Sequence, residues 1–216
     1  YREKYYAAGR FPGGYFKREA KPSEREILTA RVTDRPLRPF FPAGYRNDVQ
    51  INNALLSADG EQEPDILSVI AASAALTISE IPFFGPIAAV RVGRINGQFV
   101  VNPTHAEMEQ SDIKLTYAGS RDYPIMIEGN ANEISDADMV AAMKFGHSFI
   151  PAIIDAQLEL RRQLGLPEKV VSETLPDSAQ LAAAREIAGD AMMAALAISG
   201  KLERQDKVTE VKTTLE

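Results

Sequence analysis

Strand signals in this 216-residue chain stop near residue 130, and every regular pattern after that point is helical. Asn96-Gly97 lies between two apolar runs and is a strong signal for a two-residue type I′ hairpin. Alternating apolar residues bounded by turn residues predict strands over 48–57, 87–95, 98–101, 113–117 and 124–128. Strands mixed with helices first, and helices alone afterwards, predict an α+β domain followed by an all-α segment.

The first predicted helix follows a loop over residues 9–14, which contain glycines and a proline. Ser23 and Glu26 have the spacing of a capping box, so the helix should begin directly after Ser23. It is expected to end near Thr33, because Pro36 and the proline after it disfavour helical backbone in the residues that precede them.

The later helices lead to a domain division. Asp65 is predicted to cap an apolar helix that reaches about Ser79, and one long amphipathic helix should run from Ser135 to about Gly165. Residues 166–178 contain two prolines and several polar residues, which indicates a linker. Helices follow over 181–198 and from Lys201. We therefore expect one domain at 1–165 and a second, all-α segment at 166–216.

The composition is that of a soluble globular protein, with 45% hydrophobic and 25% charged residues. No run of about 18 apolar residues is present, so no membrane span is predicted. The absence of cysteine excludes disulfides and thiolate metal sites and fits a reducing cytoplasm. Because the chain opens without Met and without a signal-peptide pattern, we expect it to begin inside a larger protein.

Charge is distributed unevenly along the chain. Residues 1–46 contain 11 Lys or Arg and 5 Asp or Glu, whereas the remaining residues contain 13 and 25. A basic stretch on an otherwise acidic chain indicates an anionic partner for that stretch. The alternative is that these basic side chains pair with acids elsewhere in the fold.

The run GGYFKRE, residues 13–19, combines two rings and two cations after a glycine turn. Tyr15 and Phe16 can stack on bases of any identity at roughly 1–3 kcal/mol each. Lys17, Arg18 and Lys21 can neutralise phosphates. These features predict binding of single-stranded nucleic acid. The alternative is that the two rings anchor the loop to the core.

Three arginines follow on the first predicted helix and its turn. Arg31, Arg35 and Arg38 are spaced by four and three residues and therefore fall on one helical face. A guanidinium offers parallel donors in a fixed plane, which suits phosphate. The alternative is an ion-pair network in which Asp34 and the acids of the first helical turn balance these charges.

Catalytic signals are weak. His105 and His147 are the only histidines, and neither has a second histidine or a carboxylate at metal-ligand spacing. His147 is predicted to be a core or interface residue. The chain has no Ser-His-Asp order and no Walker-type phosphate loop. We therefore predict no catalytic residue, no metal ligand and no cofactor in this segment.

Residues 6–45, YAAGRFPGGYFKREAKPSEREILTARVTDRPLRPFFPAGY, resemble the signature region of the polyribonucleotide nucleotidyltransferase family, in its first ribonuclease PH-like repeat. Further motifs resemble the same repeat in order, at 71–76 (AASAAL), 81–87 (IPFFGPI), 92–98 (VGRINGQ), 102–104 (NPT) and 145–147 (FGH). The tail at 202–207 (LERQDK) is similar to the helical segment that joins the two repeats of the family.

The resemblance implies a ribonuclease PH-like domain, with a mixed or antiparallel sheet packed with helices, whose N-terminal strands precede Tyr1. It further implies that Tyr15, Phe16, Lys17 and Arg18 match the aromatic–aromatic–basic–basic loop that lines the channel of a trimeric ring and holds RNA. The family usually has Phe and Arg where Tyr15 and Lys17 stand. Both replacements keep stacking and charge, although Lys lacks the bidentate fork of Arg. The α-helical arginines 31, 35 and 38 fall in the basic helix region of the family.

The family cleaves RNA from the 3′ end with inorganic phosphate in mRNA degradation and releases nucleoside diphosphates. The resemblance places that chemistry, with Mg²⁺ or Mn²⁺, in the second repeat, where an Asp-x-Lys pair precedes an Ala-Gly step. Lys114 and Thr116 stand at those two positions here, and a cation in place of the carboxylate repels a divalent metal. This half is therefore predicted to be inactive.

The expected partners are single-stranded RNA, further copies in a homotrimer, and RNA-degradation proteins such as an endoribonuclease or a helicase; no membrane partner is expected. A second hypothesis is a non-catalytic RNA-binding ring subunit of an exosome-like assembly. The helical tail favours the first, because only the two-repeat family needs such a connector. A third, a small-molecule enzyme that uses the arginine cluster, lacks an acid–base partner.

Overall fold

The computed structural model describes residues 1–4, 7, 21–171 and 177–214. They form two compact units, Tyr1–Ser172 and Glu173–Glu216. The first unit mixes strands and helices, which confirms the predicted α+β class. Its elements in chain order are β1 (Arg2–Glu3), α1 (Glu24–Leu37), the 3₁₀ helix η3 (Arg38–Phe40), β2 (Ala54–Leu55), α2 (Asp65–Ile78), β3 (Ala88–Ile95), β4 (Gln98–Val101), α3 (His105–Glu109), β5 (Ile113–Gly119), β6 (Pro124–Ala131), α4 (Asp136–His147) and α5 (Ile150–Gln163).

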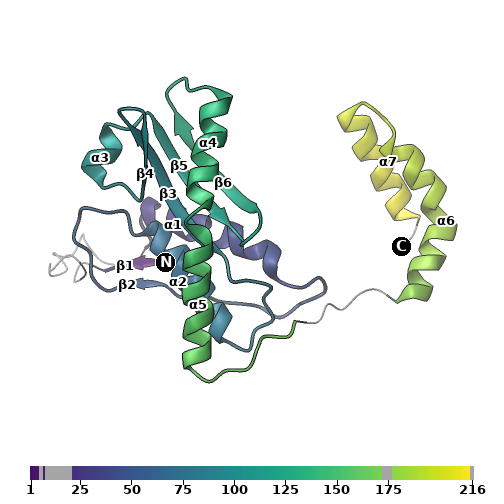
Figure 1. Cartoon of the computed structure of the whole chain (residues 1–216). Helices are drawn as coiled ribbons and strands as arrows, with labels where there is room; N and C mark the ends of the chain where they lie inside the picture. Colours follow the sequence, from purple (N-terminus) through teal and green to yellow (C-terminus); the bar gives the residue numbers. More distant parts are fainter. Residues whose placement is uncertain (5–6, 8–20, 172–176, 215–216) are drawn as a thin grey trace. The chain divides into compact units, whose positions relative to one another are not determined.

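The main sheet of the first unit has four antiparallel strands in the order β4-β3-β5-β6 (Figure 1). Its β3–β4 hairpin turns at Asn96 and Gly97, whose φ angles of 51° and 77° are both positive. This confirms the predicted type I′ turn, which needs positive φ at both central residues. The predicted pair over 113–117 and 124–128 is confirmed as β5 and β6.

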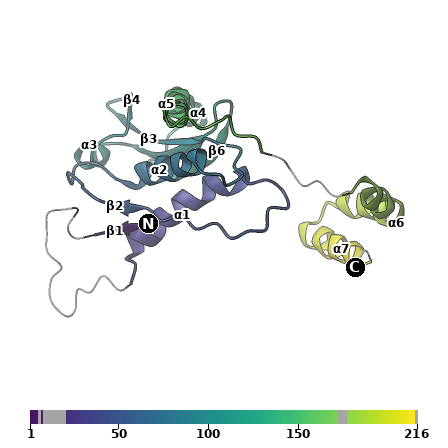
Figure 2. The same cartoon turned by 90° about the horizontal axis from the view of Figure 1, so that it is seen from below.

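Helices cover both faces of this sheet (Figure 2). On one face, Val90 and Leu115 are buried against Ile150 and Ile154 of α5, in a core that α4 completes. On the other face a second core lies beneath α2, with α1 packed against α2. Its buried members from the sheet and the two helices include Ala89, Ala118, Met126, Val69, Leu76 and Leu37. Alternate residues of β3 and β5 therefore serve different cores, as the two-residue period of a strand requires.

Helix α1 is longer than predicted. Ser23 and Glu26 form the expected capping box, but the helix ends at Leu37 and not near Thr33, with Pro36 inside it. Pro36 is fully buried and Leu37 is only 2% exposed. The burial of both side chains offsets the backbone hydrogen bond that a proline removes from a helix interior.

The strand predicted over residues 48–57 is wrong in length. Only Ala54–Leu55 join a ladder, in parallel with Arg2–Glu3. A strand needs a neighbour for its N–H and C=O groups, and among the described residues β1 offers only two positions. Asn53 instead donates from its side chain to the backbone and hydroxyl oxygens of Ser68 in α2, at 2.9 and 2.7 Å.

The single long helix predicted from Ser135 to Gly165 is wrong. The structure has two helices, α4 and α5, which are separated by Ser148 and Phe149. Pro151 lies in the first turn of α5 and has no N–H to continue the hydrogen-bond ladder across this point. The short helix α3, with its own capping box at Thr104, was not predicted.

One cation from α5 and one from the segment after it bind backbone carbonyls at and just beyond the C-terminal end of α2. The Lys169 ammonium donates to the carbonyl oxygens of Leu76 and Ile81, at 2.5 and 2.7 Å. Arg161 donates to the carbonyl of Thr77 in the same helix end. Cations at a helix C-terminus satisfy its free carbonyls and interact favourably with its dipole. Burial, with the neighbouring Arg161 charge, lowers the pKa of Lys169.

The second unit consists of α6 (Ser178–Leu196) and α7 (Lys201–Thr213), close to the two helices predicted there. Asp177 caps α6, because its carboxylate accepts from the backbone N–H of Ala179 at 3.0 Å. Within the part of the chain that the structure describes, no helix has both the length and the apolar character to cross a membrane. The division of the chain into domains at 165/166 stays a prediction.

Arg94 connects three segments of the first unit. Its guanidinium donates to both carboxylate oxygens of Asp112, at 2.9 and 2.6 Å, and lies 3.1 Å from Asp138 in the first turn of α4. Hydrogen bonds from Arg94 lower the pKa of Asp112, and those from Ser135 and Arg94 lower the pKa of Asp138. This bidentate arrangement fixes the end of β3 to the segments that precede β5 and open α4.

We expect the stabilisation from the Arg94 ion pairs to be lost in acid. Because both carboxyl pKa values are lower in the folded state, the stabilisation is complete above the ordinary pKa of 3.8 and is lost as pH falls through the lowered values. Arg94→Met should therefore reduce the free energy of unfolding at neutral pH and flatten its fall below about pH 4. Urea titrations across this range measure it; an unchanged pH slope in Arg94→Met would contradict the assignment.

Gly129 of β6 should not tolerate a side chain. A Cβ there would collide with the carbonyl oxygen of Lys114 and lie 3.0 Å from the Cα of Leu115. Since both atoms belong to the paired strand β5, relief requires a shift of the ladder. Gly129→Ala should lower the free energy of unfolding by at least about 2 kcal/mol, as chemical denaturation would measure.

Gly189 of α6 provides the contrasting substitution. A Cβ at that position meets only the Cβ of Arg185, at 4.0 Å. Gly189→Ala should therefore stabilise α6 by about 0.5–1 kcal/mol through its helix propensity. Equal effects of the two substitutions on stability would show that Gly129 of β6 has room for a side chain next to the backbone of β5, which would contradict this prediction.

Candidate functional site

The predicted RNA-binding loop is only partly described. Tyr15, Phe16, Lys17 and Arg18 lie outside the described residues. Of the chain that leads to them, residues 1–4 and Ala7 are described on one side and residues from Lys21 on the other. Ala7 is buried, and its carbonyl oxygen accepts from the N–H of Ala58 at 3.0 Å. Lys21 is exposed, two residues before the helix cap Ser23.

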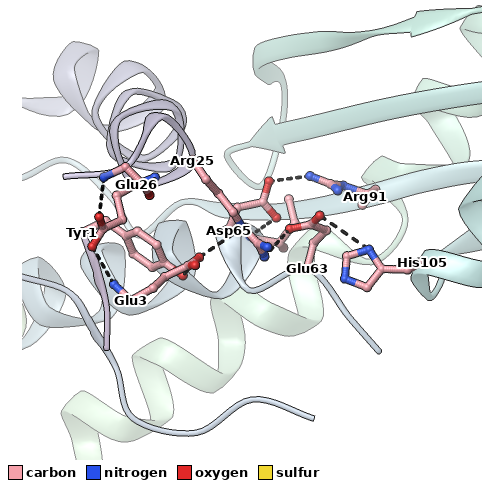
Figure 3. Close-up of polar contacts among 10 residues, drawn as sticks. Tyr1, Glu3, Arg25, Glu26, Glu63, Asp65, Arg91 and His105 are labelled. Atoms are coloured by element: carbon pink, nitrogen blue, oxygen red, sulfur yellow. Dashed lines mark hydrogen bonds and ion pairs between the residues drawn. The ribbon is translucent and has the colours of Figure 1, made fainter. Parts of the chain in front are cut away.

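Glu26 joins these two segments (Figure 3). One of its carboxylate oxygens accepts from the backbone N–H of Glu3 at 2.9 Å, and the other accepts from that of Ser23 at 2.6 Å. The side chain is only 7% exposed. A buried carboxylate must be hydrogen-bonded to remain ionised, and here main-chain donors from both segments provide those bonds.

The charge of Glu26 is stabilised by its surroundings. Burial alone would raise its pKa, but the N–H groups of Ser23 and Glu3, the Ser23 hydroxyl and the charge of Arg2 together lower it below 4.5, the ordinary value. Glu3 is itself held by the Tyr1 hydroxyl at 2.9 Å and by Arg25 at 3.2 Å. Burial, followed by the contact with Glu3, raises the pKa of Tyr1.

A chain of ion pairs continues from this point towards the sheet (Figure 3). Arg25 donates to Glu63 at 2.8 Å, and Glu63 lies 3.5 Å from Nδ1 of His105. Asp65, in the first turn of α2, pairs with Arg91 of β3. The first segment of the chain is thus connected through Arg25 of α1 to Glu63, which precedes α2, and Glu63 in turn contacts His105 of α3.

The three arginines of the basic helix differ in their environments. Arg31 is exposed and forms no ion pair with a described residue. Arg35 pairs with Glu128 of β6, and Arg38 pairs with Asp34 at 2.5 Å. The ion-pair alternative holds for Arg38, whose partner is Asp34, whereas Arg35 pairs with Glu128 and not with Asp34 or an acid of the first helical turn. Arg31 is available to a ligand. Because the paired guanidiniums are 53% and 76% exposed, their ion pairs are weak.

Lys114 and Thr116 are neighbours on one face of β5, on the side of the sheet that α2 covers only in part. They line an open hollow of about 360 Å³, with Arg91, Glu128, Gly129 and Asn130. The carboxylate in this hollow, Glu128, is paired with Arg35. Among the described residues no group of three His, Asp or Glu side chains is arranged to hold a metal ion.

His147 has a structural environment. Its Nε2 lies 3.1 Å from the carbonyl oxygen of Arg121, which can only accept, so this nitrogen carries the proton. Nδ1 lies 2.9 Å from the hydroxyl of the buried Tyr117, within hydrogen-bond distance. Both ring nitrogens of the half-buried His147 thus have a partner. These bonds attach the end of α4 to β5 and to the turn between β5 and β6.

Sequence reasoning missed the second role of Glu26. The capping-box spacing predicts its bond to Ser23, but the bond to Glu3 joins residues that are 23 positions apart. The Asp65–Arg91 pair was missed for the same reason, since Asp65 was read only as a helix cap. Its carboxylate does accept from the backbone N–H of Ile66 at 2.8 Å, while Pro64 occupies the cap position itself.

Comparison with known proteins agrees with this architecture. Residues 1–82 match domain 1 of the 3′ exoribonuclease family, and residues 85–148 match its domain 2. The chain is 48% identical over 218 residues to a polyribonucleotide nucleotidyltransferase of Methylacidiphilum infernorum and 50% identical over 216 residues to one of Akkermansia muciniphila. Each alignment covers 100% of this chain and 30% of the relative.

A solved structure supports the fold. The crystal structure of rice (Oryza sativa) Rrp46 superposes with a TM-score of 0.52 and 15% sequence identity, over 67% of each chain. The chain spans about a third of the length of the curated relatives it matches. From the matches to both domain models and the identity along its whole length, this chain belongs to the 3′ exoribonuclease family and is homologous to a segment of the polyribonucleotide nucleotidyltransferases.

Proposed function

We propose that this chain is the RNA-guiding part of a polyribonucleotide nucleotidyltransferase, a phosphorolytic 3′–5′ exoribonuclease of mRNA degradation in the cytoplasm. In this proposal Tyr15 and Phe16 stack on the bases of single-stranded RNA, and Lys17 and Arg18 bind its phosphates. Three copies form a ring whose channel these loops line. Relatives of this name, identical at 46–50% over nearly the whole chain, support the proposal.

Cations close to the loop extend the proposed RNA path. Lys21 is exposed on the segment that leads from the loop into α1, and Arg31 is exposed two turns into that helix. Neither forms an ion pair with a described residue, so each can bind phosphate without first breaking one. Arg35 and Arg38 would exchange weak surface ion pairs for contacts with phosphate. These four side chains complete the proposed RNA-binding set.

The chemistry of the β5 surface supports a non-catalytic role for this half, and this observation carries the proposal furthest. Lys114 is exposed, and the neighbouring Glu128 is engaged with Arg35. Divalent metals need several oxygen ligands, while phosphoryl transfer needs charge stabilisation at the reacting oxygens. We place Mg²⁺ or Mn²⁺ and inorganic phosphate in a second repeat of the parent protein.

The partners of the parent protein follow from the same proposal. A homotrimer would contribute three RNA-guiding loops to one channel, and an endoribonuclease or a helicase would supply it with RNA ends. The alternative is a non-catalytic ring subunit of an exosome-like assembly, which the fold of rice Rrp46 permits. A parent gene with an Asp-x-Lys repeat downstream of residue 216 would favour the enzyme, and a gene without one would favour the alternative.

Lys17→Ala combined with Arg18→Ala should weaken binding of single-stranded RNA by the assembled parent protein. Each lost phosphate contact lowers the magnitude of the slope of log K against log salt by about 0.7, so the double substitution should lower it by about 1.4. Fluorescence anisotropy of labelled RNA at several salt concentrations measures both quantities.

The matched control removes two cations from the opposite side of the first unit. Lys144 of α4 and Arg162 of α5 lie on the helices that cover the other face of the sheet. Lys144→Ala with Arg162→Ala should leave the salt slope unchanged. An RNA affinity that is insensitive to the loop substitution, or equally sensitive to both pairs, would contradict the loop assignment.

Lys114→Ala should leave phosphorolysis by the parent protein unchanged. The side chain is exposed and has no ion pair with a described residue, so its removal should change activity by no more than about twofold. Release of nucleoside diphosphate from a poly(A) substrate in the presence of Mg²⁺ and phosphate measures it. A tenfold or larger loss would place this hollow in the catalytic machinery.

A further inference from the structure

The residues that follow α5 form a segment with little packing of its own. Helix α5 ends at Gln163, and Gly165, with a φ angle of 66°, takes the left-handed conformation that commonly ends a helix. We call residues 165–171 the strap. All of them are described, none of their side chains is buried, and Val170 is 90% exposed. Burial of apolar surface therefore contributes little to holding the strap in place.

Lys169 attaches the strap directly to α2. Its ammonium donates to the carbonyl oxygen of Leu76, in the last turn of the helix, and to that of Ile81, just beyond it, at 2.5 and 2.7 Å. The side chain is half-buried. A charged group that is withdrawn from water needs such hydrogen-bond partners. The carbonyls of a distant helix end supply them here.

Arg161 of α5 makes the second attachment. It donates to the carbonyl of Thr77 in α2 and, at 2.8 Å, to the carbonyl of Pro167 in the strap. One guanidinium thus binds the helix end and the strap together. Its neighbour Arg162 instead pairs with Glu159 of its own helix, at 2.8 Å. Arg161 and Arg162 are therefore adjacent arginines with different roles.

Helix α2 has no cation of its own for these carbonyls. It is described along its whole length and has no basic residue in its last turn, whereas α1, α4 and α5 each have at least one there. The last carbonyls of a helix lack acceptor partners within it and carry partial negative charge. Arg161 and Lys169 supply the missing charge from 84 and 93 positions along the chain. The strap and the end of α2 therefore satisfy each other.

We propose that the strap is a conformational device. While it is attached, it fixes where the chain leaves the first unit, and when it is released, it becomes part of the connection to α6. A segment that is held by a few hydrogen bonds, without buried side chains, can open locally while the rest of the fold persists. Because an extended chain spans at most about 3.6 Å per residue, release adds up to about 25 Å to that connection.

Spin labels at two positions of the first unit measure the release. The chain contains no cysteine, so Lys144→Cys on α4 and Val170→Cys in the strap give one label each, at exposed positions. Pulsed electron resonance, with labelled protein diluted into unlabelled protein, should give one narrow distance distribution. Lys169→Met combined with Arg161→Met should broaden it to a width on the order of 15 Å, the span of a flexible chain of this length.

Arg162→Met is the matched control. It removes the guanidinium next to Arg161, whose partner is Glu159 of the same helix, and should leave the distance distribution narrow. A distribution that stays narrow when Lys169 and Arg161 are both methionine would overturn the proposal. The same conclusion follows if Arg162→Met broadens it equally.

Limited proteolysis separates release of the strap from loss of the fold. Glutamyl endopeptidase should cleave after Glu168 at a rate that follows the population of the open strap. Arg161→Met leaves the sequence around this bond unchanged, and we expect about tenfold faster cleavage, as for loss of a hydrogen bond to a charged group. Amide exchange at Val90 and Leu115, in the core beneath α4 and α5, should stay unchanged. Unchanged cleavage, or a loss of protection at both core amides, would refute the device.

Discussion

The burial of β3 and β5 on both faces is the constraint on which the first unit depends. Val90 and Leu115 pack beneath α4 and α5, while Ala89 and Ala118 pack beneath α2. A strand that is buried on both sides cannot shift by one residue without exchanging the members of two cores. This fixes the register of the sheet. It also fixes the positions of the polar side chains of β3 and β5 that lie on the α2 face but are not covered by α2.

Burial on the α2 side ends partway along the strands. Ala89 and Ala118 are fully buried, but Arg91 and Thr116, two residues away on the same face, border an open hollow. Since α2 begins at Asp65, its N-terminal end lies next to this boundary and pairs with Arg91. The same strands thus provide an apolar core at one end and a polar surface at the other. In this chain that polar surface carries lysine and threonine rather than a group of carboxylates.

Local signals allowed most of the fold to be predicted from the sequence. The Asn96-Gly97 turn, the Ser23–Glu26 cap and the α+β class each depend on residues that are close together in the chain. The errors arose where a distant segment decides the outcome. Pro36 remains helical because the core buries it, and residues 48–57 form only a short strand because β1 offers them two positions. Pro151 is the exception, since its missing N–H is a local signal for the break between α4 and α5.

The site was less predictable because ion pairs depend on the fold, whereas charge counts do not. The excess of basic residues in the first 46 positions was compatible with internal pairing and with an anionic ligand. Arg25 and Arg35 reach acids far along the chain, at Glu63 and Glu128, which supports internal pairing for those two. Arg31 faces solvent without such a partner among the described residues. The unevenness of charge along the sequence is therefore partly neutralised by folding. Arg31 lies on α1, the helix whose buried Glu26 accepts from the backbone N–H groups of Glu3 and Ser23.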